Sequence, residues 1–97
     1  SEPTISVKNS SSGIDLWVSI MGTPKEHAYL VGVVYPKEKK GILGLGKPKT
    51  IRWLEIYVAE ESDTVEKVFE IYFNEDNEKL FKDLRSLPKF SEMEAQN

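Results

Sequence analysis

The chain has 97 residues, and its 39% of hydrophobic residues suffices for one compact domain with a single core. It contains no cysteine, which excludes disulfides, zinc–thiolate sites and cysteine nucleophiles. The formal net charge of −3 gives the chain as a whole no attraction for nucleic acid.

Neither a membrane span nor a targeting segment is expected. No apolar run approaches the roughly 20 residues of a membrane helix. The N-terminal segment SEPTISVK lacks the charged-then-apolar order of a secretory signal. We therefore expect one cytoplasmic domain over residues 1–97, with an ordered core at about residues 4–88.

Three strands are predicted in the first 35 residues. Segment 4–9, TISVKN, alternates apolar and polar residues, and a Ser-rich turn follows it. Segment 28–35, AYLVGVVY, is apolar on both faces, which predicts a central strand, and Gly32 within it indicates a bulge, a bend or the close approach of another element. Segment 14–21, IDLWVSIM, places its aliphatic residues on one face: Ile14, Leu16, Val18 and Ile20.

A long basic loop is predicted from Pro36 to Thr50. Its five lysines against Glu38 sum to +4, and its three glycines and two prolines argue against a helix. Loops of this length in a small domain are usually functional or mobile. We expect it to be the most mobile internal segment and, because apolar residues lie between its lysines, a candidate contact surface.

Residues 51–73 are predicted to form a long antiparallel hairpin. Two runs rich in β-branched and aromatic residues, IRWLEIYV and VEKVFEIYF, flank the polar connector AEESDT. The residues expected to face the core are Leu54, Ile56, Val58, Phe69, Ile71 and Phe73.

The apolar period becomes helical after residue 73. The residues that repeat at this spacing are Leu80, Phe81, Leu84 and Leu87. Asn74 or Asp76 can cap this helix, and Pro88 ends it. The tail 89–97 is expected to be frayed.

These elements predict an α+β domain in which one C-terminal amphipathic helix closes a five-stranded antiparallel sheet or a partly open barrel. A last strand that runs into such a helix is similar in architecture to pleckstrin-homology-like rolls. A small barrel of the Sm-like or oligonucleotide-binding kind with an added helix fits as well. An open sheet has edges that commonly pair with other chains, and segment 4–9 is the expected edge.

No catalytic constellation is recognisable, and neither a metal nor a cofactor is expected. Gly41 to Lys47 matches the first seven positions of the phosphate-binding loop G-x-x-x-x-G-K, but Pro48 stands where that loop needs a Ser or Thr hydroxyl. His27 is the only histidine and lies in a polar turn, so a surface residue is favoured over a general base.

We therefore expect a non-enzymatic binding or assembly module that acts through protein–protein interaction, with another protein or a second copy as partner. The alternative is a peripheral module that binds anionic membranes or other phosphate-bearing surfaces through loop 36–50. A small enzyme with a site not visible in the sequence ranks third, and nucleic acid is not an expected partner. The expected contact residues are Lys37, Lys39, Lys40, Ile42, Leu43, Leu45, Lys47, Lys49, Arg52, Trp53 and Tyr57.

Overall fold

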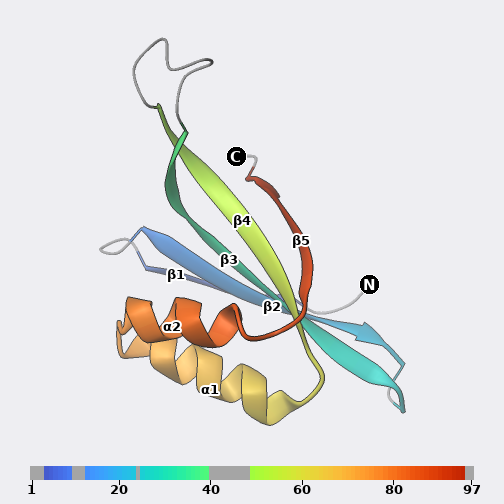
Figure 1. The fold of residues 1–97 in the computed structure, drawn as a ribbon. Coiled ribbons are helices and arrows are strands. Elements are labelled where there is room, and N and C mark those ends of the chain that lie inside the picture. Colours follow the sequence, from blue (N-terminus) through green and yellow to red (C-terminus); the bar gives the residue numbers. More distant parts are fainter. Residues whose placement is uncertain (1–3, 10–12, 24, 40–48, 96–97) are drawn as a thin grey trace.

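The computed structural model describes residues 4–9, 13–23, 25–39 and 49–95. The elements in chain order are β1 (Thr4–Asn9), β2 (Ile14–Gly22), β3 (His27–Lys39), β4 (Lys49–Ala59), α1 (Ser62–Phe73), α2 (Asn77–Leu84) and β5 (Lys89–Glu94). Figure 1 shows two layers, with both helices on one face of the sheet. The fold is an α+β arrangement of an antiparallel sheet and two helices.

The sheet is an antiparallel meander with the strand order β1-β2-β3-β4-β5. The strand β3 is the middle strand, as its apolar character on both faces predicts. Because β1 and β5 are the two edges of this order, the sheet is open, which agrees with the first of the two predicted architectures, an antiparallel sheet. Of the five predicted strand segments, four are strands, and the fifth, 65–73, is helical.

The strand register decides which side chains face the helices. Leu16 pairs with Val33 and Val33 pairs with Glu55, so these three side chains share one face. The sheet residues of the core cluster all lie on that face, and they are Ile14, Leu16, Val18, Val31, Val33, Tyr57 and Ala59. The helices complete the cluster with Val65, Val68, Ile71, Tyr72, Leu80 and Leu84.

The predicted core face is correct on β2 and reversed on β4. Ile14, Leu16 and Val18 face the helices as expected. On β4, however, Glu55 and Tyr57 face the helices, so the aliphatic residues between and beside them point to the other side. The more apolar face of this strand is therefore not its core face.

Residues 62–73 form α1 instead of the second strand of the predicted hairpin. Their β-branched and aromatic content favoured a strand, but the side chains that become buried are spaced as on one face of a helix. These are Val65, Val68, Ile71 and Tyr72. The Tyr72 hydroxyl donates a hydrogen bond to the Ile14 carbonyl at 2.6 Å and so joins α1 to β2. Phe73, expected in the core, is 62% exposed.

A tight turn joins the two helices. The amide of Glu75 donates to the carbonyl of Tyr72, and the amide of Asp76 donates to the carbonyl of Ile71, as in a Schellman motif. Glu75 has a φ of 58°, the left-handed conformation that glycine usually adopts at this position. The Asp76 side chain accepts from the amide of Lys79 at 3.2 Å, which confirms one of the two predicted caps of α2.

Two segments predicted to be irregular contain strand residues. The C-terminal tail includes β5, which pairs with β4 from Trp53–Glu94 to Tyr57–Lys89 with an irregularity near Phe90. At the predicted loop, 36–39 and 49–50 belong to β3 and β4 and extend them as a two-stranded ribbon (Figure 1). Residues 40–48, which carry the predicted mobile apolar tip, lie outside the described residues.

Candidate binding surface

The face of the sheet opposite the helices carries mostly uncharged side chains. In one row across the sheet, Trp17 pairs with Gly32, which pairs with Ile56. In the next row Val34 pairs with Leu54. We call this part of the sheet the open face. Its residues point away from the helices on β2 to β5, and they are Trp17, Ser19, Met21, Ala28, Leu30, Gly32, Val34, Leu54, Ile56, Val58, Ser91 and Met93.

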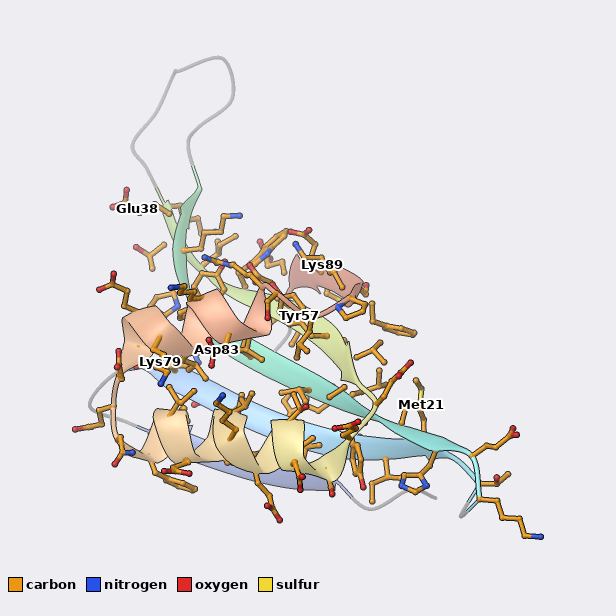
Figure 2. The ribbon with its side chains drawn as sticks, turned by 60° about the horizontal axis from the view of Figure 1, so that its bottom comes forward. Met21, Glu38, Tyr57, Lys79, Asp83 and Lys89 are labelled. Carbon is orange, nitrogen blue, oxygen red and sulfur yellow. The ribbon has the colours of Figure 1, made fainter. Side chains whose placement is uncertain are left out.

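No described helix covers the open face. Both helices lie on the other side of the sheet (Figures 1 and 2). Ile56 is reduced to 9% exposure although it is not part of the core cluster between sheet and helices. Most of the other large side chains are half-buried, and Met93 is 44% exposed. A contiguous apolar surface thus remains in contact with water.

Gly32 allows Trp17 to lie against the backbone of the central strand. A Cβ atom added to Gly32 would be 2.1 Å from Cε2 of Trp17, closer than any real contact. The close approach predicted at this glycine is therefore confirmed, and the approaching group is the indole of the neighbouring strand. It places a large aromatic ring near the middle of the open face.

An ion pair borders the open face at one end. Arg52 Nη2 lies 3.1 Å from Asp15 Oδ2, and Arg52 Nη1 donates to the Gly13 carbonyl. Both charged side chains are about one-third exposed, at 33% and 31%. The pair connects β2 to β4 across β3 and neutralises the two charges on this part of the sheet.

The helix-facing side of the sheet contains a buried carboxylate. Glu55 is 4% exposed and accepts hydrogen bonds from the hydroxyls of Tyr35 and Tyr57. Arg85 at the end of α2 lies 3.5 Å from the same carboxylate. The guanidinium also packs over the ring of Phe81, which makes an edge contact with Tyr35. Tyr57 lies close to Lys89 of β5 (Figure 2).

These contacts keep Glu55 ionised. Burial alone would raise the pKa of Glu55, but the hydrogen bonds from Tyr35, Tyr57 and Arg85 outweigh it and lower the pKa below its ordinary value. Burial, together with the hydrogen bond to the carboxylate, raises the pKa of Tyr35 to about 12 and that of Tyr57 as well. At neutral pH the acid is therefore ionised and the two phenols are protonated, which suits an anchor between α2 and the sheet.

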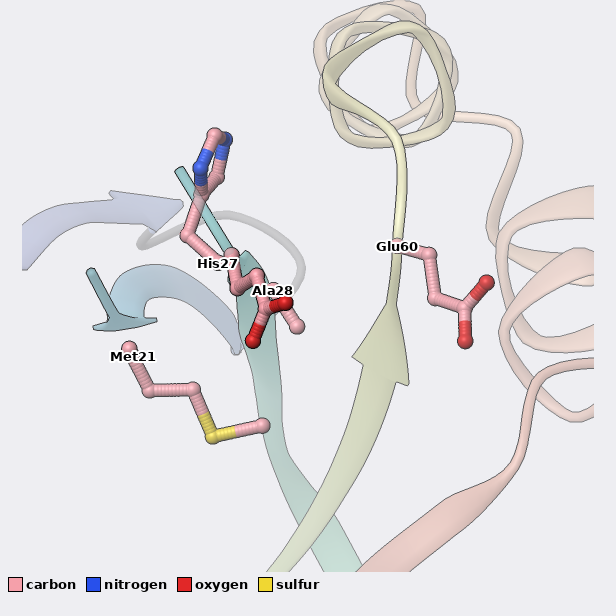
Figure 3. Close-up of a pocket in the computed structure, with 6 residues that line it drawn as sticks. Met21, His27, Ala28 and Glu60 are labelled. Carbon is pink, nitrogen blue, oxygen red and sulfur yellow. The ribbon is translucent and has the colours of Figure 1, made fainter. Parts of the chain in front are cut away.

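A hollow lies at the far end of the sheet. It has a volume of about 500 Å³ and is lined by Met21, Gly22, Glu26, His27, Ala28 and Glu60. In Figure 3 the carboxylate of Glu60 points away from the imidazole of His27. These two groups therefore do not converge on one point, as a general acid–base pair would.

The structure separates the residues predicted to form a contact surface. Lys37 and Lys49 are exposed on the ribbon, and the Lys37 ammonium lies 4.4 Å from the ring centroid of Trp53. Trp53 is half-buried on the helix-facing side, and Tyr57 is 1% exposed. Arg52 is engaged with Asp15. Lys39 ends β3, and the remaining predicted residues lie outside the described residues: Lys40, Ile42, Leu43, Leu45 and Lys47.

The sequence did not lead us to the open face, because the alternating apolar residues of β4 were interpreted as core residues. The alternation of Leu54, Ile56 and Val58 is a normal signature of a buried face. The clue to a second apolar face lay in segment 28–35, whose residues are apolar on both sides.

Within the part of the chain that the structure describes, no group of three or more His, Cys, Asp and Glu side chains is arranged to hold a metal ion. No described helix has the length and apolar character needed to cross a membrane. No protein-family model, curated protein or solved structure matches the chain.

Proposed function

We propose that the protein is a non-enzymatic binding or assembly module that acts through protein–protein interaction. The open face is the observation that carries this proposal. Antiparallel sheets with one solvated face normally show polar residues on that face. Here most of the corresponding positions hold apolar side chains, including a tryptophan, and the centre of the patch has no charge, as in the buried core of an interface.

The energetics favour an occupant for this face. Completing the burial of a side chain that is about one-quarter exposed contributes roughly 0.5 kcal/mol, given 1.5–3 kcal/mol for a fully buried aliphatic or aromatic residue. Several such residues contribute a few kcal/mol in total, before the entropy cost of association. Contiguous apolar patches of a few hundred Å² commonly mark interaction sites.

The test compares matched variants that each remove one exposed apolar side chain. Met93→Asp places a charge on the open face, whereas Phe73→Asp does so at the end of α1, away from that face. Both residues are exposed, so both variants are expected to fold, which circular dichroism checks. The proposal predicts that only Met93→Asp weakens binding of a partner identified by pull-down from native extract or of a second copy. Equal binding by both variants would remove the open face from the interface.

A second experiment addresses the membrane alternative. The wild type and a Lys37→Glu/Lys49→Glu variant are incubated with vesicles of phosphatidylserine and phosphatidylcholine, and co-sedimentation is measured. Binding through the ribbon lysines would depend on salt and on these charges. Salt-sensitive vesicle binding that the double variant abolishes, together with no protein binding, would overturn the proposal in favour of a peripheral membrane module.

A further inference from the structure

We infer that the open face packs against the same face of a second copy, giving a two-sheet sandwich with the helices on the outside. This inference rests on the proposed function and names the partner. Three features of the described residues carry it: the extent of the face, its shape and its charge.

The outward side of the sheet is close in extent to a standard interface. The five strands contain 45 residues, about half of which face away from the helices. With strands about 4.8 Å apart and a two-residue repeat of about 6.7 Å, all these positions span roughly 700 Å², of which the twelve residues of the open face make up roughly 390 Å². Standard protein interfaces bury about 800 Å² on each partner. The open face can thus form the apolar centre of such an interface, and the other outward positions, on β1 and on the ribbon, can form its rim.

The shape of the face fits a sheet better than a helix. Five strands make a surface about 24 Å wide, whereas a helix with its side chains is about 10–12 Å in diameter. A single docked helix would leave about half of the face in water. Two antiparallel sheets pack face to face about 10 Å apart, aligned within about 30°, and they interleave side chains of the size found here.

The charge of the face permits pairing with itself. In a two-fold symmetric interface the same patch occurs on both sides, so a charged centre would repel its own copy. The centre of the open face is uncharged from Trp17 to Val58. At its border Asp15 and Arg52 already neutralise each other at 3.1 Å. The register also places Lys8 at this border, opposite Asp15, so charges lie at the rim, and the uncharged centre needs no complementary charge from a different partner.

Light scattering after size-exclusion chromatography tests the inference. The chain has a mass of 11.1 kDa, and the wild type is expected to approach twice this mass as its concentration rises through the micromolar range. Met93→Asp and Val58→Lys are each expected to raise the dimer dissociation constant at least tenfold, whereas Phe73→Asp leaves it unchanged. Glu92→Pro distinguishes pairing through the β5 edge, because the alternation of the ladder turns the Glu92 amide away from β4 and its register with Glu55 places it off the open face.

Each outcome has a definite meaning. A dimer that resists the open-face variants, or one that only Glu92→Pro dissociates, overturns the sandwich. A wild type that stays monomeric but binds a different protein through Met93 overturns the second copy as partner and leaves the proposed function standing. A monomer that binds no protein overturns both. If Val58→Lys does not fold, the exposed Met93 variant still decides among these results.

Discussion

Gly32 and Trp17 form the tightest contact on the open face. Gly32→Ala brings a Cβ atom to 2.1 Å from the indole, so the ring must move away from the strand. We expect the free energy of unfolding to fall by about 1–3 kcal/mol, as for other overpacked sites. Chemical denaturation followed by tryptophan fluorescence measures it. In a Trp17→Ala background, Gly32→Ala should lower the free energy of unfolding much less. An equally large loss in that background would show that the contact with Trp17 does not cause the destabilisation.

Glu55 makes the stability depend on acid pH. Its pKa is lower in the folded chain than its ordinary value of 4.5, so the stability it contributes is fully present above pH 4.5 and is lost as pH falls through the lowered pKa. Tyr57→Phe removes a hydrogen bond to the ionised carboxylate and should destabilise the chain by about 1.5–3 kcal/mol at neutral pH.

Urea denaturation of the wild type and Tyr57→Phe over a series of pH values tests this coupling. The difference between them should narrow as pH falls below 4.5, because the protonated carboxyl is a weaker acceptor. In a Glu55→Gln background the effect of Tyr57→Phe should not change over the acid range. A constant difference in both backgrounds would disprove the coupling of Tyr57 to the ionisation of Glu55.

Glu75 stores local strain in the turn between the helices. A non-glycine residue in the left-handed region costs about 1–2 kcal/mol. Glu75→Gly should therefore raise the free energy of unfolding by about 1 kcal/mol, which thermal denaturation measures. Glu75→Ala, which loses the side chain but keeps the strain, is the control. If Glu75→Ala raised the free energy of unfolding as much as Glu75→Gly, the stabilisation would come from loss of the carboxylate and not from relief of strain.

At the level of elements, helices and strands were predicted correctly where the local spacing of apolar residues agrees with the packing around them. The alternation in β2, the central position of β3 and the capped helix α2 were all predictable from local spacing. The strand prediction for 65–73 failed because valine, isoleucine and aromatic residues satisfy both a strand propensity and the helical spacing of Val65, Val68 and Ile71. The helix forms because it buries these side chains against the sheet.

The reversed face of β4 could not be predicted from its own residues. Burying Glu55 under the helices is tolerable only because Tyr35, Tyr57 and Arg85 bond to it, and Tyr35 and Arg85 lie 20 and 30 residues away in sequence. The edge strand β5 was missed for a similar reason. Its short, mostly polar sequence has little strand signal, and its pairing depends on the free edge of β4.

Hydrogen exchange can establish whether β5 is part of the stable sheet. The Val58 amide donates to the Pro88 carbonyl at 2.9 Å, and the Ala95 amide donates to the Arg52 carbonyl at 2.8 Å. We expect both amides to exchange much more slowly than unprotected backbone amides, because their bonds open only when β5 detaches. If the Ala95 amide exchanged at the rate of an unstructured peptide, the tail would be frayed, as predicted from the sequence.

At the level of the whole molecule, the two faces of the sheet have different roles. The helix-facing side holds the core and the anchored carboxylate. The open face is mostly apolar, and in the proposed dimer a second copy would cover it with a layer of the same size and shape. In this account the apolar character of both faces of β3 reflects its position in the middle of a sandwich.

The two tryptophans lie on opposite faces of the sheet and provide the most direct test of this claim. Acrylamide quenching is measured over a range of protein concentrations in Trp53→Phe, which retains Trp17 on the open face, and in Trp17→Phe, which retains Trp53 beneath Lys37. If the open face closes on a second copy, acrylamide should quench Trp17 less and less as the protein concentration rises. Quenching of Trp53 should stay constant. Trp17 that is equally accessible at every concentration would contradict closure of the open face by a second copy.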